Sequence, residues 1–167
     1  MRMKTKPLLI TILVLVLIVL GYFIIPKLFK SSKQIEKSIA VLPFKNDSAN
    51  DSSAYFLDGI MEEILSDLTK IEDMKVLSRT SVEPYRNSTL SIAKIAKELN
   101  VVYILEGSGQ KYGNNIRLRV QLIDAKNDKH LWSQSYEKEI LKVEDIMAVQ
   151  TQIPQAITSE IKAMIAP

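Results

Sequence analysis

Apolar and polar residues follow different patterns in different parts of this chain, and the longest pattern comes first. Between residues 7 and 25 only Thr11 and Tyr22 are polar, so the run has no polar face. As a helix it would measure roughly 28 Å, close to the ~30 Å thickness of the hydrocarbon layer of a bilayer. We therefore expect a transmembrane helix at residues 7–25. A cleaved signal peptide is the alternative, but its apolar region usually spans only about 7–15 residues, and no A-x-A-like site follows.

Five further segments carry the patterns of β-strands. Nearly continuous apolar runs, typical of strands buried on both faces, are found at 38–44 and 101–105, and a short strand is expected at 74–78. Strict alternation at 116–122 predicts a strand with one polar face, and a last strand is expected at 130–138. In the alternating strand, the residues expected to point outward are Arg117, Arg119 and Gln121.

Apolar residues three or four positions apart predict three helices, over 57–71, 90–99 and 146–161. Pro154 lies inside the last of these and should kink or restart it. The order of elements is therefore β-α-β-α-β-β-β-α. Two βαβ crossovers imply parallel strands, and the closing meander adds antiparallel ones, so we expect an α/β domain of mixed α+β character with a mixed sheet.

The net charge of +3 hides an uneven distribution. Residues 1–37 hold seven basic residues and one acid, which leaves 15 basic and 18 acidic residues in the rest of the chain, so the first part is +6 and the rest −3. Nucleic-acid binding needs a basic domain surface, so no nucleic-acid partner is expected. We divide the chain into a basic N-terminus (1–6), the transmembrane helix (7–25), a basic juxtamembrane linker (26–37) and one domain (38–165).

The orientation in the membrane follows from the N-terminus. Basic residues on the two sides of the helix nearly balance, so their count alone leaves the orientation open. A very short basic N-terminus before an apolar run is typical of a signal-anchor, which leaves the following domain outside the cytoplasm. We therefore expect a single-pass membrane protein with its domain outside the cytoplasm, and a cytoplasmic domain is the alternative.

Candidate catalytic chemistry is sparse. The chain has no cysteine and a single histidine, His130, which excludes disulfides, thiolate chemistry and a multi-histidine metal site. The glycines of the segment 106–109 do not complete any phosphate-binding or nucleophile motif, and we expect them to mark a bulge or bend in a strand. We therefore predict no catalytic residues, no metal and no cofactor.

One candidate binding site follows the second strand. Arg79, Thr80 and Ser81 are expected in a loop at the C-terminal end of that strand, where open α/β sheets place ligand sites. An arginine beside two hydroxyls would suit a carboxylate or a phosphate. A structural brace of the loop is the alternative.

A second candidate lies on the last strands. We expect the outward-facing Arg117, Arg119 and Gln121 to form an aromatic and basic face together with Trp132 and Tyr136. Arginine and large aromatic residues are enriched in protein–protein interfaces, so such a face would suit a protein partner. Ordinary solvated strand positions are the alternative.

Seven stretches, taken in order, resemble a known family of bacterial domains. They are IAVLPFKN (39–46), YFLDGIMEEI (55–64), VLSRTS (76–81), IAKELNV (95–101), LEGS (105–108), VQLID (120–124) and LWS (131–133). The chain is similar to the TolB-like, or FlgO-type, domain found after a transmembrane helix in many envelope and regulatory proteins. The resemblance implies the fold of the N-terminal domain of TolB, a mixed sheet flanked by helices, and it does not imply an enzyme.

The resemblance also bears on function. Domains of this kind occur in transmembrane winged-helix regulators and in proteins with adenylate cyclase domains, where catalysis belongs to the attached domain. We expect a non-catalytic, membrane-anchored protein-interaction or sensory module of the bacterial envelope, held in the inner membrane by residues 7–25, with a periplasmic domain and envelope protein partners. The alternative is a cytoplasm-facing regulatory component that acts with a separate cyclase or transcription regulator.

Overall fold

The computed structural model describes Leu15, residues 37–48 and residues 53–165. The chain divides into two compact units, Met1–Ile35 and Glu36–Pro167. The transmembrane helix expected at 7–25 lies outside the described residues except for Leu15, and the linker expected at 26–37 lies outside them except for Lys37. Among the residues that are described, no helix combines the length and the apolar character needed to cross a membrane.

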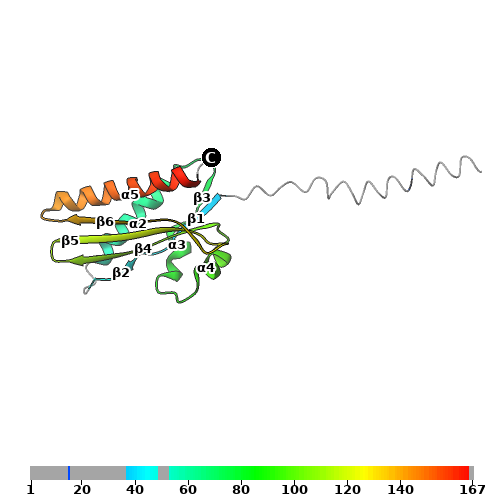
Figure 1. Ribbon diagram of the computed structural model, residues 1–167, viewed down its shortest axis with the longest axis horizontal. Coiled ribbons are helices and arrows are strands. Elements are labelled where there is room, and N and C mark those ends of the chain that lie inside the picture. The colour runs from blue at the N-terminus through cyan, green and yellow to red at the C-terminus, as the bar shows by residue number, and fades with distance from the viewer. Residues whose placement is uncertain (1–14, 16–36, 49–52, 166–167) are drawn as a thin grey trace, which may run out of the picture. The chain divides into compact units, whose positions relative to one another are not determined.

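The second unit follows the order of elements that the sequence predicts, with three short elements added (Figure 1). The added elements are β2, α3 and η2, in segments expected to be loops. In chain order the elements are β1 (Lys37–Val41), β2 (Lys45–Asn46), α2 (Ala54–Leu68), β3 (Met74–Val76), α3 (Arg79–Val82), the 3-10 helix η2 (Glu83–Tyr85), α4 (Ile92–Leu99), β4 (Tyr103–Tyr112), β5 (Asn115–Asp124), β6 (Lys129–Glu139) and α5 (Val143–Ile165).

The strands form one mixed sheet in the order β3-β1-β4-β5-β6, which confirms the mixed α/β fold expected from the sequence. β1 runs parallel to both β3 and β4, as two βαβ crossovers require, and β4, β5 and β6 form the antiparallel meander. The short β2 continues alongside β4 beyond the end of β1, where Lys45 is in register with Ser108. β6 is the last strand of this order and has one hydrogen-bonded neighbour in the sheet.

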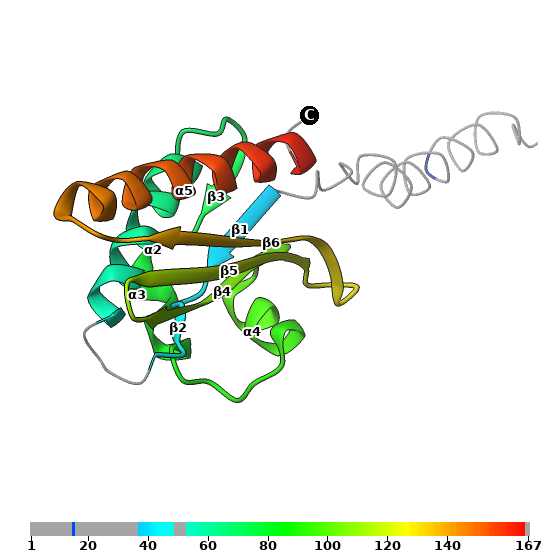
Figure 2. The same ribbon diagram turned by 60° about the vertical axis from the view of Figure 1, so that its left-hand side comes forward.

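Helices cover one face of the sheet along its length and only part of the other. α2 and α5 bury the larger core, to which the apolar face of β5 contributes Leu118, Val120 and Leu122. α4 and Val82 cover Ala40 of β1 on the opposite face, in a smaller core. Figure 2 shows α5 and α4 on opposite sides of the sheet. No helix among the described residues covers the part of the second face that belongs to β5 and β6.

The sequence predicts a kink or a restart of the last helix at Pro154, and the restart does not occur, because α5 runs unbroken from Val143 to Ile165. Pro154 is itself buried, and Ile153 and Ile157 beside it pack into the larger core. Burying one isoleucine contributes about 1.5–3 kcal/mol, so a stripe of buried residues on both sides of the proline offsets its helix-breaking cost of about 3 kcal/mol.

The glycines of β4 mark close packing, and the predicted bulge at these positions is wrong. The pairing of β4 with β5 is regular from Tyr103 to Tyr112, and the register shift of the meander lies instead between Leu122 and Ile123. A Cβ at Gly109 would lie 2.1 Å from Cδ2 of Leu57 on α2. The absence of a side chain at this position therefore lets α2 approach the sheet.

Candidate functional site

Three cross-strand rows of polar side chains cover the part of the sheet that has no helix. The register of β4, β5 and β6 aligns residues that share a face, because paired residues point to the same side of a sheet. The rows are Glu106–Gln121–Ser133, Ser108–Arg119–Ser135 and Gln110–Arg117–Glu137. We call these nine residues the polar face.

A groove of about 650 Å³ lies between the polar face and the segment that joins η2 to α4. Leu42 and Pro43, which follow β1, line its floor, so the groove is at the carboxyl end of a parallel strand. Open α/β sheets bind ligands at this end of their strands. The charged residues that line the groove are Lys45, Arg86, Glu106 and Arg119.

Two candidate residues, Arg117 and Arg119, both lie on the polar face but have different surroundings. The guanidinium of Arg117 donates to Glu137 Oε2 at 3.1 Å and lies 5.6 Å from the ring centroid of Tyr112, so its charge is compensated. Arg119 is exposed and has no hydrogen-bond or ion-pair partner among the residues described by the structure. Arg119 is therefore the arginine of this face that remains available to a ligand.

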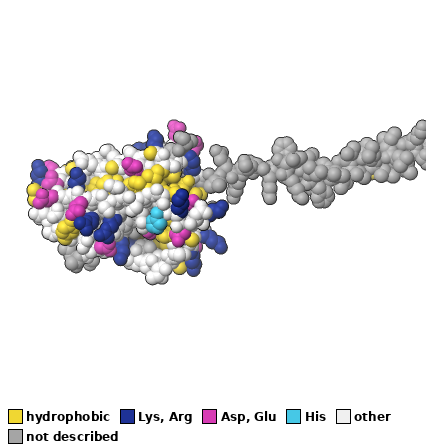
Figure 3. Space-filling model, viewed as in Figure 1, with side chains coloured by type: hydrophobic (Ala, Val, Ile, Leu, Met, Phe, Trp, Pro, Cys, Tyr) yellow, Lys and Arg dark blue, Asp and Glu magenta, His cyan; other side chains and the backbone are white. Residues whose placement is uncertain are grey.

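Trp132 and Tyr136 do not join these arginines, so the expected aromatic and basic face does not form. The register places Trp132 opposite Leu122 and Tyr136 opposite Leu118, on the side of the sheet that α2 and α5 cover. Figure 3 shows hydrophobic side chains gathered where α5 lies over β6, with basic and acidic side chains below that line. The available signal was the spacing along β6, since Trp132 and Tyr136 share one face of a strand while Ser135 between them points to the other.

Arg79, Thr80 and Ser81 form a helical turn, α3, and the loop expected at these positions is wrong. Ser78 precedes the turn in an extended conformation, and its hydroxyl lies 3.0 Å from the hydroxyls of both Thr80 and Ser81. Both hydroxyls that were expected to accompany a ligand are thus engaged within the turn.

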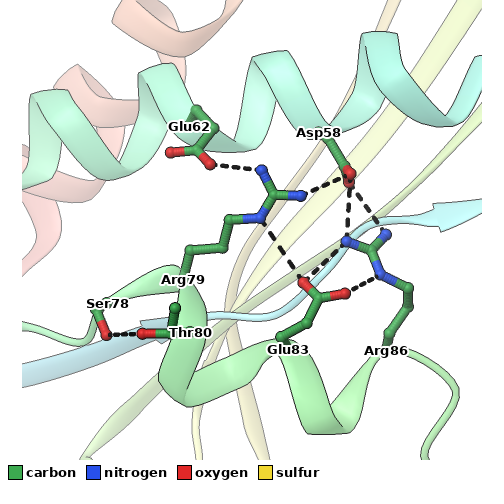
Figure 4. A network of polar contacts seen from close by, with 7 residues as sticks. All are labelled: Asp58, Glu62, Ser78, Arg79, Thr80, Glu83 and Arg86. Atoms are coloured by element: carbon green, nitrogen blue, oxygen red, sulfur yellow. Dashed lines mark hydrogen bonds and ion pairs between the residues drawn. The ribbon is translucent and has the colours of Figure 1, made fainter.

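The guanidinium of Arg79 points away from these hydroxyls and toward α2 (Figure 4). It donates to Asp58 Oδ2 at 2.8 Å and to Glu62 Oε1 at 2.6 Å. The hydrogen bond to Glu62 raises the pKa of Arg79 further above its ordinary value. This geometry favours the brace over the anion site, because two carboxylates of α2 already occupy the guanidinium.

Arg86 completes the same network. Its guanidinium donates to Asp58 Oδ1 at 3.0 Å and to Glu83 Oε1 at 2.6 Å, so Asp58 accepts from both arginines (Figure 4). The hydrogen bond from Arg86 lowers the pKa of Glu83. Sequence reasoning had not selected Asp58, Glu83 or Arg86. The spacing of Asp58 and Glu62, which puts two acids on one helix face, was the available signal.

An apolar pocket of about 310 Å³ lies at the hairpin end of the sheet, between the first turns of α2 and α5. Its lining includes Ile116 and Ile140. Four apolar side chains in or next to the segments that line this pocket are strongly exposed, namely Tyr55 (86%), Leu141 (69%), Val143 (68%) and Met147 (65%), of which Tyr55 lines the pocket itself. We call these four residues the apolar patch. Lys37, the first residue of β1, is at the opposite end of the sheet, because β1 begins beside the start of β4.

Histidine and acidic side chains are the remaining candidates for binding a metal ion. His130 is exposed at the start of β6. No group of three or more histidine, aspartate or glutamate side chains within the described ranges is close enough to hold a metal ion.

Solved structures share this fold at low sequence identity. TolB from Acinetobacter baumannii superposes with a TM-score of 0.54 and 15% identity, over 78% of this chain and 28% of that one. Lipoprotein GNA1162 from Neisseria meningitidis gives a TM-score of 0.54 and 17% identity, over 77% of this chain and 99% of that one. The expected TolB-like fold is thereby confirmed.

Sequence comparisons give a closer relationship. A protein of Rhizobium meliloti (strain 1021) named putative adenylate cyclase 3 is 41% identical over 125 residues, which are 75% of this chain and 21% of that protein. The chain thus spans about a fifth of that relative's length. A family model described as the second domain of HilA/YgeH-like transcriptional regulators matches residues 35–156, and the chain therefore belongs to that family.

Proposed function

We propose that residues 38–165 are a non-catalytic protein-interaction module of the bacterial envelope, held at the inner membrane by residues 7–25, with the domain in the periplasm. The apolar patch carries this proposal. Soluble domains rarely leave several large apolar side chains exposed near an apolar pocket unless another molecule covers them. A protein partner fits the patch because aromatic residues and methionine are enriched in the buried centres of protein interfaces.

Other observations support a module that binds without catalysis. Arg79 and Arg86 are held by carboxylates of the same domain. The sole histidine lies at an exposed strand position and has no hydrogen-bond or ion-pair partner within the described part of the chain. The fold likeness to TolB and to lipoprotein GNA1162 supports an envelope location for this domain.

Photo-crosslinking tests the apolar patch directly. A photoreactive amino acid at position 147 of the full-length chain is expected to give a discrete crosslinked product in living cells. The same amino acid at position 164 is the matched control, because Met164 lies on the same helix but outside the patch. In a second strain, Leu141→Glu should lower the yield at position 147 about tenfold or more, as expected when a charge enters an apolar interface. Equal products at positions 147 and 164 would remove the support for this patch.

A second candidate function is a cytoplasm-facing regulatory component that acts with a separate cyclase or transcription regulator. Two observations favour it, the family's description as a domain of transcriptional regulators and the likeness to a protein named as an adenylate cyclase. The two functions differ in the side of the membrane on which the domain lies.

Protease accessibility separates the two candidates. We expect a C-terminal tag on the full-length chain to be digested in intact spheroplasts, because a short basic N-terminus before an apolar run directs the C-terminal side out of the cytoplasm. A cytosolic protein that stays intact in the same sample controls for lysis. A tag that survives until the cells are lysed would place the domain in the cytoplasm and favour the regulatory component.

A further inference from the structure

The middle row of the polar face has a different charge from the rows on either side. It consists of Ser108, Arg119 and Ser135, and β2 adds Lys45 in register with Ser108. The extended row thus contains two cations, two hydroxyls and no acid. Adjacent strands are about 4.8 Å apart, so four strands carry this row over roughly 14 Å. We call these four residues the cationic row.

The rows on either side of the cationic row have their polar groups engaged across the strands, whereas Arg119 in the cationic row does not. Arg117 pairs with Glu137 in one adjacent row, and Gln121 donates to Glu106 in the other. Lys45 lies 3.4 Å from Asp47, but its side chain is 79% exposed and an ammonium has three donors. Arg119 has no partner among the described residues. Of the two arginines in the described strands, the fold therefore pairs Arg117 and leaves the guanidinium of Arg119 uncompensated.

The groove gives this row the shape of a binding site. Lys45, Ser108, Arg119 and Ser135 all line the groove of about 650 Å³. Arg86 also lines it, but its guanidinium is held by Asp58 and Glu83 on the far wall. Glu106 is the one acid among the described residues of the lining, so the groove carries an excess of positive charge.

We infer that the groove binds a small molecule that carries phosphate, with Arg119 as the principal contact. A guanidinium donates two parallel hydrogen bonds to a phosphate, and the flanking hydroxyls of Ser108 and Ser135 supply further donors. Lys45 provides a second positive charge about two strand spacings, or roughly 10 Å, from Arg119. A molecule with two phosphate groups can contact both. This site is separate from the apolar patch and does not depend on which protein occupies that patch.

Calorimetric titration of the full-length chain in a nonionic detergent tests the site, with pyrophosphate as the probe. The wild-type chain is expected to bind one pyrophosphate per chain, and Arg119→Gln should weaken binding at least about tenfold, the loss of one charge-assisted contact. Arg117→Gln is the matched control, because it removes an arginine from the same strand and face whose charge is already paired. Glu106→Gln should tighten binding severalfold by removing the acid of the groove.

Two results would overturn the inference. One is a wild-type chain without saturable binding, and the other is an equal loss of affinity in Arg119→Gln and Arg117→Gln. Both arginines are at least partly exposed, so neither variant should unfold, and circular dichroism checks this. Leu141→Glu should bind pyrophosphate as the wild type does, which separates failure of this site from failure of the protein-docking proposal.

The same titration distinguishes two sources of phosphate. The full-length chain is reconstituted in phosphatidylcholine nanodiscs and in nanodiscs where part of this lipid is replaced by phosphatidylglycerol. Pyrophosphate binding that is weaker in the nanodiscs with phosphatidylglycerol would assign the site to a lipid headgroup, provided that this difference between the two lipids disappears in Arg119→Gln. Equal binding in both lipids would assign it to a soluble phosphate compound.

Discussion

Replacing Leu57 with alanine is expected to lower the free energy of unfolding by about 2–5 kcal/mol, the range for a buried leucine truncated in a packed core. Leu57 is 2% exposed on α2 and points at Gly109 of β4. Its side chain fills the space that the missing Cβ of Gly109 leaves. Tyr55→Ala, two residues earlier in the same helix, is the control and should change stability by less than about 0.5 kcal/mol because Tyr55 is exposed.

The partner of this substitution is Gly109→Ala, which is expected to cost about 1–3 kcal/mol by overpacking. The added methyl would meet Cδ2 of Leu57 at 2.1 Å and Cδ1 at 2.9 Å, so the leucine must leave its position. In the double variant the methyl enters the space that Leu57 vacates. The cost of the double variant should therefore be smaller than the sum of the single costs by about 0.5–3 kcal/mol.

Urea unfolding followed by circular dichroism measures these differences in the full-length chain. Strictly additive costs would mean that Gly109 is required by something other than the approach of Leu57. A double variant less stable than the sum predicts would contradict the packing of α2 on β4 directly.

The same pair of residues shows why part of the fold could be predicted and part could not. Strict alternation at 116–122 predicted β5 correctly, because one face of an antiparallel strand packs on the core while the other is solvated. The role of Gly109 depends on a side chain that is distant in sequence. Glycine in a strand is compatible with a bulge and with a close approach alike, and local pattern cannot distinguish them.

The short helices α3 and η2 could not be predicted from the sequence for a different reason. α3 and η2 together span only Arg79–Tyr85, which is too short for a hydrophobic period to be recognised. Pro84, in the first turn of η2, and Ser78, extended just before α3, were local signals of helix starts. In the structure the segment is anchored by the buried side chain of Val82 and by ion pairs to α2.

The candidate binding sites, like the fold, could be predicted from the sequence only in part. The sequence indicated that Arg117 and Arg119 point outward, and the structure agrees. It did not indicate which partners each arginine meets, because Glu137 pairs with Arg117 only through the register of β5 and β6. Lys45 joins Arg119 through β2, a strand of two residues that no sequence pattern marked.

Asp58→Asn is expected to lower the free energy of unfolding by about 1–3 kcal/mol, since it removes the carboxylate that accepts from two arginines and leaves both short of a partner. Asp58 is partly buried, so solvent screens these bonds less than those of an exposed pair. Glu62→Gln is the matched control on the same helix face. Glu62 is half exposed and bonds to Arg79 alone, so its loss should cost less than about 1 kcal/mol. Equal costs in chemical denaturation would show that Asp58 has no special place in the network.

The network should also respond to acid in a defined direction. The hydrogen bond from Arg86 lowers the pKa of Glu83, so the folded state favours the ionised carboxylate. The stability that this bond contributes is present above the ordinary glutamate pKa of about 4.3 and is lost as the pH falls through the lower folded value. Unfolding measured from pH 7 down to pH 3 should therefore show a loss of stability below about pH 4 that is smaller in Glu83→Gln.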